Sequence, residues 1–360
     1  MTPFHALTSG DLPLLAGFHE EGILANLMPL GQSFDVQNPP PLLFFDAVGT
    51  SPALRHLHIS VTGRFDSLQK SRSHWAFLTK LEIEVDRPTL GCVSSMQGLS
   101  RSCPLLRELT ITRLYNPIQL DETVVEVSEW IHLREFTLIL VRQPAPTFMS
   151  SLFNIFESFT APSLTDLSLA VKPFGSRWDD ESFDYEADLP FHNFIIRSQC
   201  QLNSLRLDMP FGENSLRKTL DLLSSLTSFT VDITHSPHYL HVPTTSNHLD
   251  GIVRALSPST EFVVCPALKN LYITSCRPED AVVLVNLIEA RAMHNTKLET
   301  LRAKFWSLSR ASVRVLNSAL ELGKSKGLGV KIEWEYRKEA FEFDDPHIYS
   351  SHPTHEVLVG

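Results

Sequence analysis

The chain has 360 residues, of which 43% are hydrophobic and 20% are charged, and its formal net charge is −10 at pH 7. This apolar fraction is enough for a sizeable core and excludes an intrinsically disordered chain. The negative charge argues against a general binder of nucleic acids or anionic membranes, because such proteins need a basic face. We therefore expect neither as a partner.

The cysteines and the hydropathy pattern indicate an intracellular protein. The N-terminal stretch lacks the basic and then apolar pattern of a signal peptide, and the longest apolar run, residues 281–288, is too short to span a bilayer. An odd, scattered set of cysteines without a C-x-x-C pair is typical of reduced thiols; the five are Cys92, Cys103, Cys200, Cys265 and Cys276. We expect a soluble, cytoplasmic or nuclear protein.

The first 45 residues are predicted to cap the fold. The segment DLPLLAGFHEEGILANLM, residues 11–28, is interpreted as an amphipathic helix that either caps the fold or is the outer helix of a degenerate first repeat, whose core positions are Phe34 and Val36. Residues 1–45 are therefore assigned as an N-terminal capping helix with a degenerate first repeat.

From residue 46 onward the sequence repeats the pattern L-x-x-L-x-L. The last two apolar positions are two residues apart, so on a short strand both point to the same buried face, and the first leucine precedes the strand. Successive first leucines are 24 to 42 residues apart. The nine triplets are Leu54-Leu57-Ile59, Leu78-Leu81-Ile83, Leu106-Leu109-Ile111, Leu133-Phe136-Leu138, Leu164-Leu167-Leu169, Leu202-Leu205-Leu207, Leu226-Phe229-Val231, Leu268-Leu271-Ile273 and Leu298-Leu301-Ala303.

The segments between these hexapeptides fit helices. Residues 146–159 carry an apolar stripe at helical spacing, residues 278–294 open with proline and two acidic residues, and residues 308–327 have Ser309 as a candidate N-cap and Gly327 as a stop. Strand, turn and helix recurring every ~25 to 30 residues form the unit of a leucine-rich-repeat solenoid. We predict an α/β horseshoe of nine to ten irregular repeats over residues 46–336, with parallel strands on the concave face and helices outside.

Two long spacings and the C-terminus interrupt this pattern. Residues 172–190 form an acidic, aromatic loop that is either solvated or in contact with a partner; the spacing of a calcium-binding loop is missing. Residues 235–251 contain four histidines at no recognised zinc spacing, which favours solvated side chains. Residues 337–360 have lost the repeat and are predicted to be a tail.

The phrases SPALRHLHIS, CPLLRELTIT, APSLTDLSLA and CPALKNLYIT resemble the irregular repeats of the F-box-associated leucine-rich-repeat proteins of mushroom-forming fungi. The resemblance covers residues 30–306 and implies a non-enzymatic recognition module that presents a target protein for ubiquitin transfer. In that family an F-box ahead of the repeats docks on a Skp-type adaptor. Leu12 and Pro13 are not followed by the rest of that motif, so we expect the adaptor only if an F-box lies upstream.

No motif of a hydrolase, kinase, nucleotide-binding protein or metalloprotease is present in the sequence, and we expect no enzyme, cofactor or metal. The residues flanking the buried strand positions are predicted to form a partner-binding concave face, acidic in its first half and basic at its last rung. A free-standing scaffold and, as a less favoured alternative, a GTPase-activating regulator remain open. The predicted face comprises His56, His58, Glu82, Glu84, Glu108, Thr110, Glu135, Thr137, Asp166, Arg206, Asp208, Asp232, Asn270, Tyr272, Arg302 and Lys304.

Overall fold

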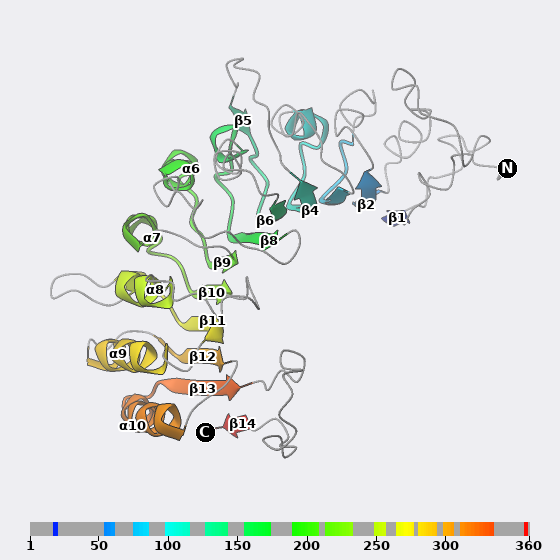
Figure 1. The fold of residues 1–360 in the computed structure, drawn as a ribbon. Coiled ribbons are helices and arrows are strands. Elements are labelled where there is room, and N and C mark those ends of the chain that lie inside the picture. The colour runs from blue at the N-terminus through cyan, green and yellow to red at the C-terminus, as the bar shows by residue number, and fades with distance from the viewer. Residues whose placement is uncertain are drawn as a thin grey trace, which may run out of the picture. The chain divides into compact units, whose positions relative to one another are not determined.

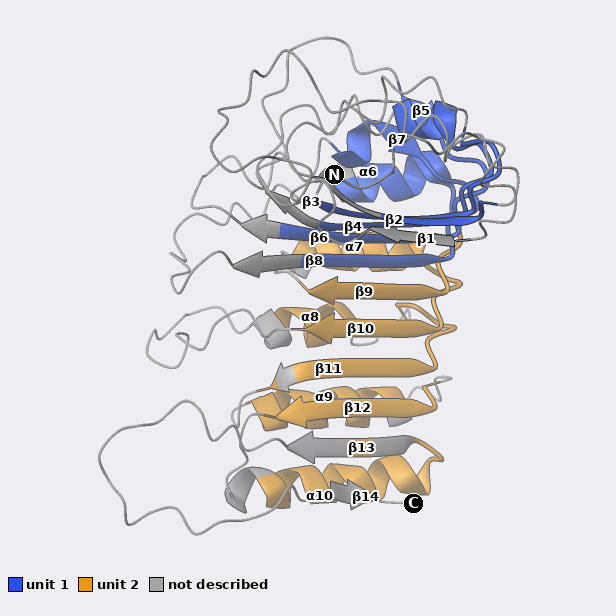
Figure 2. Cartoon of the chain, turned by 90° about the vertical axis from the view of Figure 1, so that its right-hand side faces the viewer, with its two compact units in different colours: residues 1–174, 179–200 blue, residues 175–178, 201–360 orange. Residues whose placement is uncertain are grey.

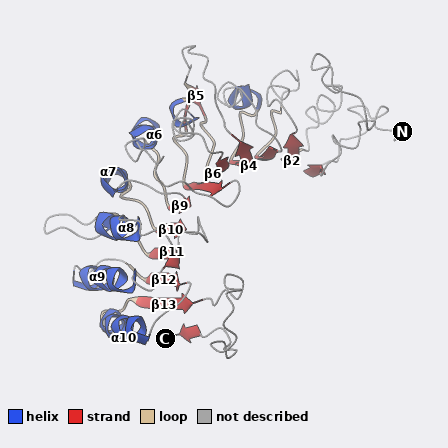
Figure 3. Cartoon of the chain, in the orientation of Figure 1, coloured by secondary structure: helices blue, strands red, loops and turns tan. Residues whose placement is uncertain are grey.

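The fold is α/β, as predicted, and is built from parallel strands and helices (Figures 1 and 3). A computed structural model describes residues 17–20, 54–61, 75–85, 98–115, 127–142, 155–173, 189–208, 213–232, 248–256, 264–276, 280–293, 298–305, 310–334 and 356–358. The chain divides into two compact units, which Figure 2 colours separately. Unit 1 is Met1–Phe174 with Asp179–Cys200, and unit 2 is Gly175–Trp178 with Gln201–Gly360.

Unit 1 contains a ladder of parallel strands in the order β1-β2-β3-β4-β6-β8. Helix α6 (Leu189–Ser198) and a second small parallel sheet, β5 (Ser128–Glu129) with β7 (Phe159–Thr160), stand on one side of it (Figure 1). The ladder strands are β1 (Gly17–Glu20), β2 (His56–Val61), β3 (Lys80–Val85), β4 (Glu108–Tyr115), β6 (Glu135–Arg142) and β8 (Asp166–Pro173).

Unit 2 continues the same alternation, with strand order β9-β10-β11-β12-β13-β14, all parallel except the last pair. Its helices lie behind the strands in the view of Figure 2. The strands are β9 (Ser204–Asp208), β10 (Ser228–Asp232), β11 (Asn270–Cys276), β12 (Thr300–Phe305), β13 (Gly329–Trp334) and β14 (Glu356–Leu358). The helices are α7 (Glu213–Leu222), α8 (His248–Leu256), α9 (Asp280–Met293) and α10 (Arg310–Ser325).

A strand lies at each of the nine L-x-x-L-x-L hexapeptides, and the apolar positions are buried as the spacing requires. Every triplet side chain that the structure describes is at most 5% exposed; the side chain of Ile59 lies outside the described set. The first leucine is buried because the chain turns just before the strand. In six of these turns the N–H of that leucine donates to the carbonyl three residues earlier, which belongs to Trp75, Cys103, Trp130, Ala161, Leu223 and Cys265.

Within each unit, a ladder of backbone hydrogen bonds links neighbouring strand entrances, from β2 to β8 in unit 1 and from β9 to β12 in unit 2. The carbonyl of Arg55 accepts from the N–H groups of both Thr79 and Lys80, at 2.9 Å each. The same bifurcated contact recurs at the carbonyls of Thr79, Arg107, Arg134, Asn203, Thr227 and Lys269. The hydroxyl of Thr79 adds a third donor to Arg55, at 3.1 Å. Because this ladder uses backbone groups, its geometry tolerates different side chains at each entrance.

The core of unit 1 is aromatic on the helix side. Phe159 packs edge-on against Phe136, with ring centroids 5.6 Å apart, and lies 5.0 Å from Phe194 of α6. The ring centroids of Phe156 and Phe194 lie 5.1 Å apart, so tilted aromatic contacts hold α6 to the preceding segment.

Two arginines join a helix to the segment before it. In unit 1, Arg197 near the end of α6 donates to the carbonyls of Phe156 and Phe159, the latter at 3.1 Å. In unit 2, Arg291 near the end of α9 donates to the carbonyl of Leu256 at 2.7 Å and to that of Val264 at 3.0 Å. Each guanidinium therefore satisfies carbonyls that lie near the ends of other elements.

The structure corrects the N-terminal assignment and adds to the C-terminal one. Residues 17–20 form strand β1 rather than a capping helix, because they pair with the edge strand β2, and Gly17 is a poor helix former. Within the predicted tail, β14 pairs antiparallel with β13.

Several sequence predictions concern residues outside the described ranges. The remainder of residues 1–45, including Phe34 and Val36, most of both long loops, and most of the predicted helix 146–159 belong there. Of the other two predicted helices, 278–294 corresponds to α9 and 308–327 to α10.

Helix α10 ends at Ser325, and Gly327, the predicted stop, lies two residues beyond it. Gly327 has φ +77°, the left-handed region that glycine enters at little cost. Its N–H donates to Lys324 at 3.0 Å, and the N–H of Leu328 donates to Gly323 at 2.9 Å. These two bonds are the Schellman arrangement, which satisfies carbonyls at the end of the helix.

Candidate functional site

In each unit the predicted binding residues lie on the strand face opposite the helices; in Figure 2, where the strands of unit 2 face the viewer, no described helix lies in front of them. Parallel pairing in register places outward side chains of neighbouring strands side by side, about 4.8 Å apart. In unit 1 the first such row contains His56, Lys80, Glu108, Glu135 and Asp166. The second contains His58, Glu82, Thr110, Thr137 and Ser168.

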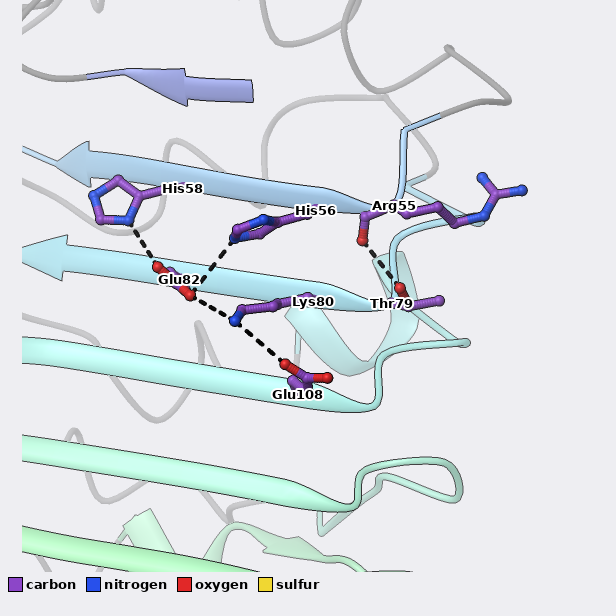
Figure 4. Close-up of polar contacts among 7 residues, drawn as sticks. All are labelled: Arg55, His56, His58, Thr79, Lys80, Glu82 and Glu108. Atoms are coloured by element: carbon purple, nitrogen blue, oxygen red, sulfur yellow. Dashed lines mark hydrogen bonds and ion pairs between the residues drawn. The ribbon is translucent and has the colours of Figure 1, made fainter. Parts of the chain in front are cut away.

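Glu82 is the centre of a polar network at one end of this face (Figure 4). Its Oε2 lies 3.0 Å from Nδ1 of His58, and its Oε1 lies 3.0 Å from Nζ of Lys80 and 3.6 Å from Nε2 of His56. Partial burial acts to raise the pKa of Glu82, but hydrogen bonds with His58 and Lys80 outweigh it and leave the pKa below its usual value. The hydrogen bond to Glu82 raises the pKa of Lys80.

Beyond Lys80, three carboxylates follow one another on adjacent strands: Glu108, Glu135 and Asp166. Lys80 reaches Glu108 at 3.4 Å. Partial burial, together with the charges of Glu108 and Asp166, raises the pKa of Glu135. Like charges directly opposite each other on neighbouring strands destabilise a sheet. A cationic ligand bound to this row would relieve the repulsion among the three carboxylates.

The corresponding face of unit 2 has a different character. Its first row holds small polar side chains, Ser204, Ser228, Asn270 and Thr300. Its second row holds Arg206, Thr230, Tyr272, Arg302 and Lys331.

Two contacts organise the second row of unit 2. The guanidinium carbon of Arg302 lies over the ring of Tyr272, 4.9 Å from its centroid. Arg206, whose side chain is 54% exposed, approaches Asp232 at 3.9 Å, and Asp232 also accepts a hydrogen bond from the hydroxyl of Thr274. The two arginines of the row are exposed, and the neighbouring carboxylate of Asp232 already contacts Arg206 and Thr274.

Fifteen of the sixteen predicted face residues are exposed or half-buried in the structure. Asp208 is the exception, because it is only 7% exposed and so is not available to a partner. The alternation of burial stops at Leu207 and Asp208, both buried, where β9 ends. Lys331 was missed because β13 does not follow L-x-x-L-x-L; the alternation of Val330, Ile332 and Trp334 was the available signal.

The described cysteines do not have the properties of nucleophiles. Cys103, Cys200, Cys265 and Cys276 are buried thiols. Burial raises the pKa of Cys103 and Cys265 to about 12 and that of Cys200 to about 11. Burial also raises the pKa of Cys276. These thiols are protonated at neutral pH, whereas the thiolate is the reactive form.

Within the described parts of the chain, no group of three or more histidine, cysteine or acidic side chains is placed to hold a metal ion. None of the helices described is long and apolar enough to cross a membrane. Comparison of the chain with models of protein families and with curated proteins finds no match.

Proposed function

We propose that this chain is a leucine-rich-repeat protein that recognises a protein partner through the strand face opposite its helices. The observation that carries the proposal is the in-register row Glu108, Glu135 and Asp166 of unit 1. These side chains are on the accessible face and contribute nothing to the apolar core, and their mutual repulsion is an energetic cost that a cationic segment of a partner would remove.

Three recurring features support the leucine-rich-repeat assignment. The first is the strand at each L-x-x-L-x-L hexapeptide. The second is the turn that ends on the first leucine, and the third is the bifurcated backbone ladder between strand entrances. In a solenoid each repeat contacts its neighbouring repeats, so every added strand enlarges the accessible strand face, which can serve as an extended binding surface.

The test compares two matched double variants of the full chain. Glu108→Gln with Glu135→Gln removes two charges from the strand face. Glu129→Gln with Glu157→Gln removes two charges from exposed positions in β5 and in the segment preceding β7, both parts of the layer opposite that face. Partners are isolated by crosslinking in the native cells and quantified by mass spectrometry.

We expect the face variant to reduce recovery of specific partners by about fivefold or more, with the control variant unchanged. If both variants recover the same partners to the same extent as the wild type, the strand face is not the binding surface and the proposal fails.

The resemblance to F-box-associated proteins extends the proposal to an assembly: the partner would be a target presented to a ubiquitin ligase. The same isolation tests this step separately, because a Skp-type adaptor should be recovered with the wild type and with both variants. If partners whose recovery depends on the strand face are isolated without an adaptor, the recognition function stands and the ubiquitin-ligase role fails.

A further inference from the structure

The second row of unit 2 has a chemistry opposite to that of the acidic row in unit 1. Four of its five positions are cationic or aromatic: Arg206, Tyr272, Arg302 and Lys331, with Thr230 between Arg206 and Tyr272. Arg206 and Arg302 are exposed, and Tyr272 and Lys331 are half-buried. No acidic residue occupies this row, so an approaching anion meets positive charge on three of the five strands.

Contact with Tyr272 restrains the side chain of Arg302, which favours binding of such an anion. The guanidinium carbon lies 4.9 Å from the centroid of the tyrosine ring, within the range of a cation–π contact. The ring restrains the side chain of Arg302, and a guanidinium can donate two in-plane hydrogen bonds to one carboxylate. The ring thereby reduces the conformational entropy that Arg302 would lose on binding.

The spacing of the cations fits an extended chain that crosses the strands. Arg206 in β9 and Arg302 in β12 are separated by three strand steps, or about 14 Å. An extended peptide advances about 3.4 Å per residue, so side chains four residues apart on one side of it are separated by nearly the same distance. Lys331 lies one strand beyond Arg302.

We propose that this row binds an extended acidic segment of the protein partner, with carboxylates four residues apart placed at Arg206 and at the Arg302–Lys331 pair. The inference rests on the proposed recognition function and supplies the chemistry of one partner segment. The neighbouring row of Ser204, Ser228, Asn270 and Thr300 offers polar side chains along the same path.

The experiment measures fluorescence anisotropy of labelled peptides with the full chain at low salt. The probe alternates Glu and Thr; two matched peptides carry Gln or Lys in place of Glu. Because the chain has a net charge of −10, general electrostatics would repel the Glu peptide, so tighter binding of the Glu peptide than of the Gln peptide reports a local cationic site. The Lys peptide measures the general attraction, including that of the acidic row in unit 1. We expect the Glu peptide to bind more tightly than the Gln peptide and to weaken as salt is added.

Substitutions then locate the site. Arg302→Met and Lys331→Met should each weaken binding of the Glu peptide about two- to fivefold. Arg314→Met, an exposed arginine on α10, is the matched control and should leave it unchanged. Tyr272→Leu should weaken binding while leaving every charge in place. Equal affinity for the Glu and Gln peptides, no binding up to about 1 mM, or equal effects of Arg302→Met and Arg314→Met would each overturn the inference.

The outcome is separable from that of the proposed function. If the Glu peptide does not bind, but partner recovery still depends on Glu108 and Glu135, the recognition function stands and only the acidic-segment inference fails. If partner recovery does not depend on Glu108 and Glu135, the recognition function itself fails, whatever the peptides do.

Discussion

Arg291 is a buried arginine whose replacement tests how helices α8 and α9 of unit 2 are held together. It is 2% exposed, and one of its terminal nitrogens donates to the carbonyls of Leu256 and Val264, at 2.7 and 3.0 Å. Leu256 is the last residue of α8, so its carbonyl has no donor within that helix. Burial lowers the pKa of Arg291, as expected for a cation withdrawn from water.

The perturbation is Arg291→Met, which keeps most of the volume and removes the donors. Hydrogen bonds from a charged donor contribute about 1.5–3 kcal/mol each, and a buried acceptor left without that donor keeps its desolvation cost. Removing the charge also relieves its own desolvation, which offsets part of the loss. We expect a net loss of about 2–4 kcal/mol in the free energy of unfolding of unit 2.

Urea denaturation followed by circular dichroism measures the loss, and hydrogen exchange in α8 and α9 localises it. Arg291→Lys should not rescue, because the lysine side chain is one bond shorter, so its strongly hydrated ammonium group falls short of the position from which one arginine nitrogen donates to both carbonyls. The control is Arg314→Met at the surface of α10, which should change stability by less than about 0.5 kcal/mol. A loss for Arg291→Met as small as that of the control, or full rescue by lysine, would refute the bonding argument.

Four further outcomes follow from the structure. Gly327→Ala should lower stability by about 1–2 kcal/mol because φ is +77°, and Gly327→Asn should lose less; thermal unfolding of the pair tests whether backbone conformation is the cause. Glu135→Gln should stabilise the protein at neutral pH, because the raised pKa of Glu135 means that ionisation opposes folding; the gain should vanish in stability measurements as pH falls below the ordinary carboxyl pKa. Glu82→Gln should do the reverse: a lowered pKa gives stability that is present above the ordinary pKa and lost as pH falls through the lowered one, so the variant should show a shallower acid-side slope. Alkylation in native buffer should be slow, and in urea fast, at Cys103, Cys200, Cys265 and Cys276.

The parallel strands were predictable because their signal is local. Two apolar residues two apart, preceded by a third, place one strand face in the core whatever surrounds it. Leu133, Phe136 and Leu138 are at most 1% exposed, as that pattern requires. The outward positions follow from the same alternation, and for this reason nearly all of the predicted face residues are accessible in the structure.

What the sequence does not reveal depends on partners that are distant along the chain. Strand β1 is separated from its partner β2 by more than thirty residues, so no local pattern marks Gly17–Glu20 as a strand. The contacts of Arg291 join residues 27 and 35 positions apart. The cation–π contact between Arg302 and Tyr272 depends on the register of β11 and β12, which hydrophobic spacing does not fix to the residue.

The backbone and arginine contacts that join strand entrances and helices do not involve the outward side chains of the strands, so the substitutions on the strand face test binding rather than loss of stability. Strand entrances are joined by backbone hydrogen bonds, and helices are joined by Arg197 and Arg291 to carbonyls of the preceding segments. None of these contacts uses an outward side chain of β3 to β12. Exposed substitutions away from caps, cores and buried networks usually change stability by less than about 0.5 kcal/mol. Loss of partner binding in Glu108→Gln or Arg302→Met therefore reports on recognition, whereas the same loss in Arg291→Met would report on unfolding.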